Sequence, residues 1–150
     1  MKIGVWVQLK LNMKHTKVFV NGTFDVLHYG HFKLLETARN LGDILYVAID
    51  TDERIKEKKG DNRPFHNVLE RREMLDAIVH VTKVFTFDSD EELITLIRAI
   101  NPDIYVIGSD YKDKPIVGEK YLKNIVFVPR LEKFSTTKIM NYELQATPRI

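Results

Sequence analysis

The chain has 150 residues, a length that suits one domain with one hydrophobic core, and it contains no cysteine, which excludes disulfides, zinc–thiolate sites and cysteine nucleophiles. Its formal net charge is +2, from 23 basic and 21 acidic residues, which is too small to indicate a nucleic-acid partner. No apolar run approaches the roughly 18 residues of a membrane helix and no signal peptide is recognisable, so we expect a cytoplasmic protein that does not contact a membrane.

Residues 1–14 precede the regular pattern of the chain. From Ile3 to Lys10 apolar and polar residues alternate, which is typical of a strand. Two interpretations are open: a loosely held leader, or an added edge strand that contacts a second copy of the chain in a homodimer. We favour the leader because the pattern of the domain begins only at Lys17, and we place the domain at residues 15–150.

From Lys17 onwards, short apolar runs alternate with helical patterns. Strands are predicted at 17–20, 44–49, 84–87, 104–107 and 125–128. Helices are predicted at about 30–40, 69–79, 90–100 with Asp90 as cap, near 119–123, and after an N-cap at Ser135 or Thr136. The polar stretch 50–67 is expected to be a long loop. This alternation predicts an α/β fold, a single Rossmann-like doubly wound domain with a five-stranded parallel sheet.

Four polar turns each follow a predicted strand. Because the carboxyl ends of parallel strands meet at one edge of the sheet, we expect these turns to lie together there, although they are far apart in the sequence. Ligands of open α/β sheets bind at that edge. The turns are 21–31, 50–64, 108–118 and 129–137.

The turn from Asn21 to His31 carries the clearest chemistry. It contains neither the G-x-G-x-x-G of dinucleotide-binding folds nor the G-x-x-x-x-G-K-[ST] of Walker-type NTPases. Gly22 lets a ligand approach the backbone closely, and Gly30 leaves the start of the next helix open to a phosphate. The imidazoles of His28 and His31 can donate hydrogen bonds to phosphate oxygens or to a leaving pyrophosphate.

The two histidines also have other interpretations. They could bind a metal ion, but the zinc-protease helix spaces its histidines four residues apart around a glutamate, and no third ligand is evident in this sequence. Either histidine could instead simply cap the helix. We therefore expect no metal that is held by the protein itself.

The His28-Tyr29-Gly30-His31 motif resembles that of the H-x-G-H nucleotidyltransferase superfamily, and especially its cytidylyltransferase-like branch. The resemblance covers about residues 17–141, because further segments fall in the family's order. These segments are Lys59-Gly60-Asp61-Asn62-Arg63-Pro64, Leu69-Glu70-Arg71-Arg72, Gly108-Ser109-Asp110-Tyr111 and Ser135-Thr136-Thr137.

The resemblance implies a reaction and a role for each matching residue. A phosphate oxygen of the acceptor would attack the α-phosphate of an NTP, and pyrophosphate would leave. Mg²⁺ would accompany the NTP, held mainly by phosphates and water. The implied catalytic residues are His28, His31, Lys59 and Arg72, the last preferred over Arg71 for its register with Glu70. The implied nucleotide-binding residues are Gly22, Thr23, Phe24, Gly30, Asp110, Arg130, Ser135, Thr136 and Thr137. Acceptor binding is implied for Asp25, Arg63 and Tyr111.

Two kinds of substrate remain open. The 59–64 and 108–112 segments resemble the adenylyltransferase domain of the bifunctional heptose enzyme, which uses ATP and a heptose 1-phosphate, and we favour this assignment. The segment 130–139 resembles glycerol-3-phosphate cytidylyltransferase, which uses CTP, although Leu131 and Lys133 replace the usual threonine and glycine. A nucleotide-binding module without catalysis is the alternative from another functional class. The expected partners are thus an NTP and a small phosphorylated sugar or polyol.

Overall fold

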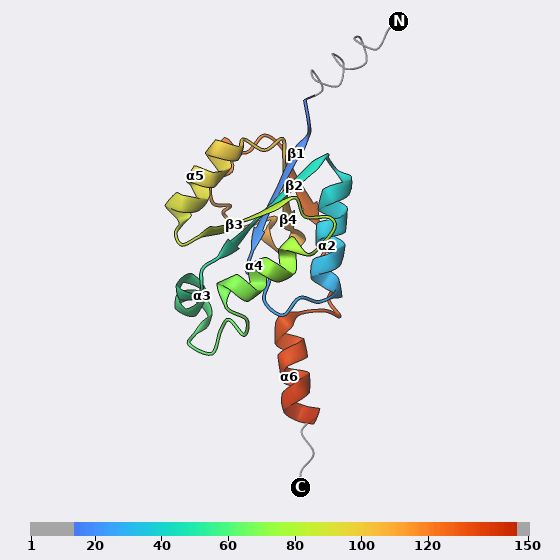
Figure 1. Cartoon of the computed structure of the whole chain (residues 1–150), viewed down its shortest axis with the longest axis vertical. Coiled ribbons are helices and arrows are strands. Elements are labelled where there is room, and N and C mark those ends of the chain that lie inside the picture. The colour runs from blue at the N-terminus through green and yellow to red at the C-terminus, as the bar shows by residue number, and fades with distance from the viewer. Residues whose placement is uncertain (1–13, 147–150) are drawn as a thin grey trace, which may run out of the picture.

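A five-stranded, all-parallel sheet forms the centre of the molecule (Figure 1). The computed structural model describes residues 14–146. The strands are β1 (Lys17–Gly22), β2 (Ile44–Asp50), β3 (Lys83–Phe87), β4 (Ile104–Gly108) and β5 (Ile125–Val128), and their order in the sheet is β3-β2-β1-β4-β5. The predicted doubly wound parallel fold is confirmed.

Both faces of the sheet are apolar because side chains alternate along each strand. Val18 and Val20 of β1 pack with Leu35 of α2 (Tyr29–Asn40) and Leu75 of α4 (Val68–Asp76). On the opposite face, Phe19 packs with the inward side of α5 (Asp90–Ile100) and with the segment around the 3₁₀ turn η2 (Glu119–Tyr121). The two helical layers therefore cover the sheet from both sides (Figure 1).

The strand order reverses between β1 and β4. From β1 the chain steps to β2 and β3 on one side, and then crosses back to β4 and β5 on the other. The pairing of β1 with β2 continues to Gly22, whereas the pairing of β1 with β4 stops at Val20 and Val106. The two strands thus separate at their carboxyl ends, which opens a crevice at the position where such folds bind ligands.

The predicted loop at 50–67 is wrong in its first half, which forms helix α3 (Asp52–Lys59). The side chain of Thr51 caps the start of this helix. Acidic residues occupy its first turn and lysines occupy its last turn, a distribution of charge that the helix dipole favours. Only Arg54 and Ile55 are buried, so the helix has almost no apolar face for a sequence pattern to reveal.

Several element boundaries also differ from the prediction. Helix α5 is capped by Ser89 rather than Asp90, and α4 begins at Val68, where Asn67 and Glu70 form a capping box. A second 3₁₀ turn, η1, spans Ser109–Tyr111 after β4. The last helix, α6 (Thr136–Ala146), is capped by Ser135, whose Oγ accepts from the Lys138 amide, and it extends away from the sheet (Figure 1).

The expectation of a leader or edge strand at 1–14 falls on residues outside those the structure describes, except for Lys14, whose Nζ lies 3.4 Å from Asp103. Among residues 14–146, no helix has the length and apolar character needed to cross a membrane.

Candidate active site

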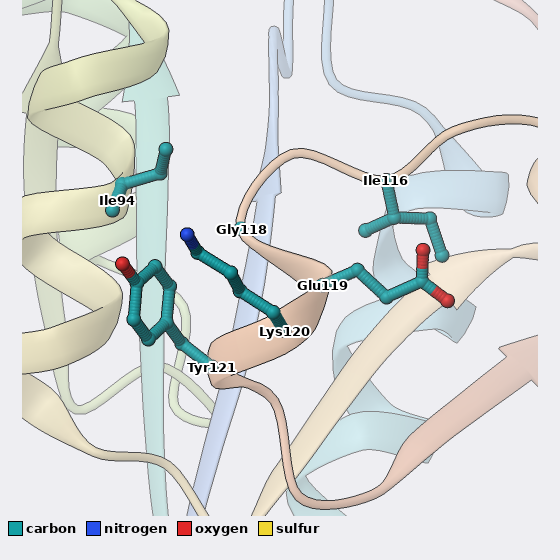
Figure 2. A pocket seen from close by; sticks show the side chains of 6 residues that line it. All are labelled: Ile94, Ile116, Gly118, Glu119, Lys120 and Tyr121. Atoms are coloured by element: carbon teal, nitrogen blue, oxygen red, sulfur yellow. The ribbon is translucent and has the colours of Figure 1, made fainter.

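A cavity of about 950 Å³ lies at the carboxyl ends of the strands. The four turns that were expected to meet at this edge all contribute to its walls. Of the predicted site residues, all except Arg72 line it. These are Gly22, Thr23, Phe24, Asp25, His28, Gly30, His31, Lys59, Arg63, Asp110, Tyr111, Arg130, Ser135, Thr136 and Thr137. A smaller hollow of about 480 Å³ lies between Ile94 of α5 and the segment 116–121 (Figure 2), and it contains none of the predicted residues.

The two histidines form the N-terminal capping box of α2. His28 Nδ1 accepts from the Gly30 amide at 3.1 Å, and His31 Nδ1 accepts from the His28 amide at 3.4 Å. Because each Nδ1 accepts a hydrogen bond, the proton of each neutral ring is on Nε2. The capping interpretation and the phosphate-binding interpretation are therefore compatible, since capping uses one nitrogen and leaves the other as a donor.

The rings of His28 and His31 stack, with centroids 3.8 Å apart and an angle of 22° between their planes. Burial and the charge of Arg130 lower the pKa of His28. Burial, with the charges of His28 and Arg130, lowers the pKa of His31 to about 3. Both imidazoles are thus neutral donors at physiological pH, and they keep hydrogen-bonding capacity without adding to the positive charge.

Gly30 is required by the position of the His28 ring. A Cβ at Gly30 would lie 2.9 Å from His28 Cε1 and 3.0 Å from His28 Nδ1, closer than such contacts occur. The glycine of the motif therefore leaves space for the neighbouring imidazole as well as for a ligand.

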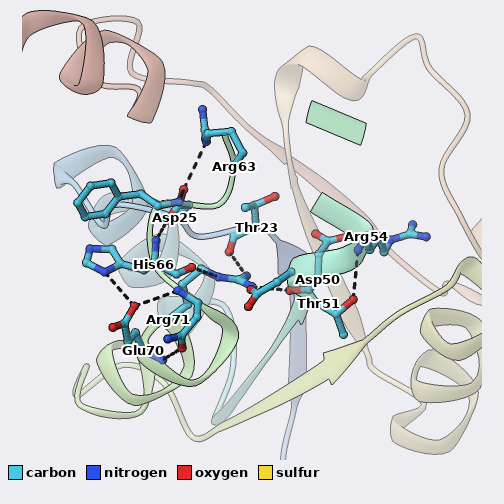
Figure 3. A network of polar contacts seen from close by, with 12 residues as sticks. Thr23, Asp25, Asp50, Thr51, Arg54, Arg63, His66, Glu70 and Arg71 are labelled. Atoms are coloured by element: carbon cyan, nitrogen blue, oxygen red, sulfur yellow. Dashed lines mark hydrogen bonds and ion pairs between the residues drawn. The ribbon is translucent and has the colours of Figure 1, made fainter. Parts of the chain in front are cut away.

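The turn after β1 is held by the Asp25 carboxylate, which is 1% exposed. It accepts from the amides of Phe65 at 2.8 Å and His66 at 2.9 Å, and Arg63 Nε lies 3.4 Å from it (Figure 3). Phe24 and Val26, on either side of it, both have positive φ (51° and 47°), which residues with side chains rarely adopt. Asp25 thus fixes a strained turn at the edge of the cavity, and its part in acceptor binding stays a prediction.

Lys59, the last residue of α3, reaches into the cavity. Its Nζ donates to Thr23 Oγ1 at 3.1 Å, which joins α3 to the turn after β1. Burial and the nearby charge of Arg63 lower the pKa of Lys59. Helix α3, absent from the sequence prediction, therefore carries this expected catalytic side chain into place.

Arg71, rather than Arg72, is the arginine directed inward from α4. Arg71 is fully buried and donates to the carbonyls of Thr23, His66 and Asp50 and to the Asp52 carboxylate, at 2.7 to 3.0 Å (Figure 3). Arg72 is half-exposed, lies 3.7 Å from Asp76 and does not line the cavity. The structure therefore does not bring Arg72 to the site, where a phosphate-binding role had been expected for it.

The opposite wall comes from the segments after β4 and β5. Arg130 donates to Asp110 Oδ2 at 2.8 Å. Burial raises the pKa of Asp110, but the hydrogen bond and charge of Arg130, a backbone hydrogen bond and the charge of Lys114 together lower this pKa below its ordinary value. Thr136 Oγ1 donates to the Asp25 carbonyl at 2.6 Å, so the start of α6 lies against the turn after β1. The N-terminal ends of α6 and α2 thus border one cavity.

Asp50 and Arg54 are among the cavity residues that the sequence reasoning missed. Both are nearly buried, and Arg54 Nε donates to Asp50 Oδ1 at 2.8 Å. The signal that could have found Asp50 is its place directly after a buried parallel strand, the same signal that found the turn after β1.

Among residues 14–146, no group of three or more His, Asp or Glu side chains is placed to hold a metal ion. The carboxylates of Asp25 and Asp110 are already engaged by amides or an arginine. The site is therefore built from cationic and neutral hydrogen-bond donors, which suits a phosphorylated ligand.

The chain is similar to known proteins over most of its length. Bifunctional protein HldE from Campylobacter fetus is 42% identical over 126 residues, 84% of this chain. HldE from Campylobacter jejuni strain RM1221 is 44% identical over 132 residues, 88% of this chain. The matches cover 27% and 28% of those proteins, so the chain spans just over a quarter of the length of these curated relatives.

Solved structures share the fold. The lipopolysaccharide core biosynthesis protein from Thermoplasma volcanium aligns with a TM-score of 0.63 at 22% identity, over 77% of this chain and 98% of that one. Pantoate-β-alanine ligase from Francisella tularensis aligns with a TM-score of 0.58 at 15% identity, over 94% of this chain and 76% of that one. At these identities the likeness concerns the fold alone.

A family model described as cytidylyltransferase-like matches residues 19–142, which includes every element from β1 to β5 and the start of α6. The chain therefore belongs to the cytidylyltransferase-like family.

Proposed function

We propose that the chain transfers a nucleotidyl group from a nucleoside triphosphate to a phosphorylated sugar, with release of pyrophosphate. The observation that carries this proposal is the stacked, neutral His28–His31 pair at the start of α2, in one cavity with Lys59 and the start of α6. Because Nδ1 of each imidazole already accepts a hydrogen bond and Nε2 carries the proton, both rings face the ligand as donors, which suits a direct transfer between two phosphates.

The transfer needs no covalent intermediate on the protein. An oxygen of the acceptor phosphate forms a bond to the α-phosphorus, and the bond from that phosphorus to the β-phosphate oxygen breaks. Nε2–H of His28 and His31 donates to the oxygens on which negative charge increases, and Lys59 neutralises part of that charge. The amides at the start of α2 and α6 bind the remaining phosphate oxygens.

Mg²⁺ fits this site as the counterion of the nucleotide. The described side chains provide no carboxylate cage, so the phosphates and water would hold the ion. When bound, it would supply charge neutralisation on the triphosphate.

We propose ATP as the nucleotide and a heptose 1-phosphate as the acceptor. The support is the 42–44% identity to HldE proteins, together with the resemblance of segments 59–64 and 108–112 to the heptose adenylyltransferase domain. The second candidate is a CTP-dependent polyol-phosphate cytidylyltransferase, which the segment 130–139 favours through Arg130 and the Ser135-Thr136-Thr137 cap.

Pyrophosphate release measured with each of the four NTPs, crossed with heptose 1-phosphate and glycerol 3-phosphate, tests this assignment. We expect turnover with ATP and heptose 1-phosphate. Turnover with CTP and glycerol 3-phosphate instead would select the second candidate. Nucleotide binding with no turnover for any pair would leave a binding module and refute the enzyme.

The same assay tests the histidine roles with H28N and H31N. Asparagine also caps helices well, so α2 is preserved while the Nε2 donor is removed. We expect kcat to fall by about 10²–10³ for each variant, with little change in nucleotide KM, since the donors act mainly on transition-state charge. H15N, at an exposed position outside the cavity, is the matched control and should match the unchanged protein.

A further inference from the structure

The cavity extends beyond the groups used above. The triphosphate donors are at the starts of α2 and α6 and in the segment after β5. The cavity continues in the other direction, past β1, to the ends of β2 and β3, where Asp50, Arg54 and Phe87 line it. This half contains the acidic side chain missed by the sequence reasoning.

The Asp50 carboxylate is preorganised there. It is 7% exposed and its Oδ1 accepts from Arg54 Nε at 2.8 Å. Arg54 is itself fixed by a second ion pair with Asp90, and its guanidinium lies 5.2 Å from the centre of the Phe87 ring. Within the part of the chain that the structure describes, Oδ2 of Asp50 accepts no hydrogen bond, although the residue lines the cavity. The carboxylate therefore presents one oriented, unused acceptor oxygen.

Asp50 also lies next to the residues that handle phosphate. The single guanidinium of Arg71 donates to the carbonyls of both Thr23 and Asp50, each at 2.9 Å (Figure 3). The hydroxyl of Thr23 accepts from Lys59. A ligand whose phosphate contacts Lys59 would therefore place the atoms bonded beyond that phosphate near Asp50.

The chemistry of a carboxylate decides which ligand group it can bind. An ionised carboxylate only accepts hydrogen bonds, so it repels phosphate and favours a hydroxyl donor. The donors at the start of α6 and in the segment after β5 lie on the β4–β5 side of β1, and Lys59, hydrogen-bonded to Thr23, lies between that side and Asp50, so we assign the half of the cavity beside Asp50 to the acceptor.

On the basis of the proposed function, we propose that Asp50 Oδ2 accepts a hydrogen bond from a hydroxyl on the carbon chain of the acceptor, with Arg54 holding the carboxylate in place. Asp50 is then a specificity-determining residue that selects a polyhydroxylated phosphate ester.

The test compares D50N with D76N. In D50N the amide oxygen can still accept from Arg54, so the amide nitrogen faces the cavity and an anionic acceptor becomes a neutral donor. D76N is the matched control, because Asp76 is an exposed carboxylate on α4 that pairs with Arg72 and does not line the cavity. Binding of heptose 1-phosphate is measured by calorimetry in the presence of a non-hydrolysable ATP analogue, beside turnover with ATP.

We expect D50N to raise the Kd of heptose 1-phosphate about tenfold, because charge-assisted hydrogen bonds are roughly twice as strong as neutral ones. The KM for ATP and the Mg²⁺ requirement should stay within about twofold of the unchanged protein, and D76N should leave both of them and the Kd of heptose 1-phosphate unchanged. Monodeoxy analogues of the acceptor identify the hydroxyl, because removing the right one weakens binding to the unchanged protein but not further to D50N. If D50N does not fold, D50S replaces it, with the same expected rise.

Three outcomes would overturn the inference: an unchanged Kd in D50N, a higher KM for ATP, which would place the ribose at Asp50, or a higher Mg²⁺ requirement, which would make Asp50 a metal ligand. Failure of the proposed function gives a different result. In that case heptose 1-phosphate binds and depends on Asp50, but no pyrophosphate is released. Absence of sugar-phosphate binding to the unchanged protein would refute both proposals.

Discussion

The low pKa of His31 makes the stability of the protein depend on pH. In the unfolded chain this imidazole has an ordinary pKa of 6.5, whereas in the folded chain burial and the charge of His28 lower the pKa to about 3. Between these values the unfolded state binds a proton that the folded state does not. The stabilisation is therefore complete above pH 6.5 and decreases as the pH falls towards 3.

Urea unfolding at pH 7.5, 6 and 4.5 measures this effect. For the unchanged protein, His31 should reduce the free energy of unfolding by up to about 1.4 kcal/mol per pH unit below 6.5. H31Q should lose that part of the pH dependence, and H15Q, changed at an exposed position, should keep it. Equal slopes for H31Q and the unchanged protein would show that the ring is not held neutral.

Gly30 offers a second test at the level of single residues. In G30A the new Cβ would lie 2.9 Å from His28 Cε1, so the imidazole must move. Alanine favours a helix, and the fold should be retained. We expect kcat to fall about 10²-fold, because a displacement of about 1 Å has this effect on positioned groups. An unchanged kcat at an unchanged melting temperature would contradict the need for this ring position.

At the level of elements, the position of α3 depends on buried arginines rather than on an apolar face. Arg71 ties the start of α3, through Asp52, to the carbonyls at the ends of β1 and β2. R71A should therefore lower the free energy of unfolding by about 3–5 kcal/mol, since it leaves Asp52 and several carbonyls without a partner. R72A is the adjacent control, and its half-exposed ion pair with Asp76 contributes less than about 1 kcal/mol.

Urea unfolding of both variants gives the comparison. If R71A does not fold, R71K replaces it, because lysine keeps the charge but cannot contact several acceptors at once. If R71A and R72A lowered the free energy of unfolding equally, burial of the guanidinium would not determine how much each arginine contributes to stability.

The sequence could predict the sheet and most of the cavity because short continuous apolar runs and turn residues carry that information locally. It could not predict α3, whose eight residues include only Ile55 as a buried apolar residue. It also could not separate Arg71 from Arg72. The cap at Asn67 sets which of two adjacent arginines turns inward, and the predicted helix start was one residue late. Asp50 was missed because its partner Arg54 belongs to α3.

At the scale of the whole molecule, the reversal of strand order organises the site. The sheet continues on both sides of β1, so one cavity reaches residues after β5 and residues at the end of β2. Donors gather towards the starts of α2 and α6, and the unused carboxylate oxygen lies towards β3. Under the proposed function, both substrates would bind in this one crevice, with the nucleotide towards β5 and the acceptor towards β2 and β3.

This arrangement predicts how the protein responds to removal of divalent metal. Residues 14–146 contain no group of carboxylates and imidazoles that could hold an ion, so EDTA should leave the melting temperature of the ligand-free protein unchanged. With ATP present, EDTA should abolish pyrophosphate release and reduce the rise in melting temperature that ATP causes, because the triphosphate then enters without its counterion. Mg²⁺ added in excess over EDTA is the control. It should restore pyrophosphate release and the rise in melting temperature that ATP causes. A fall of several degrees in the ligand-free protein would instead reveal a metal held by the chain itself.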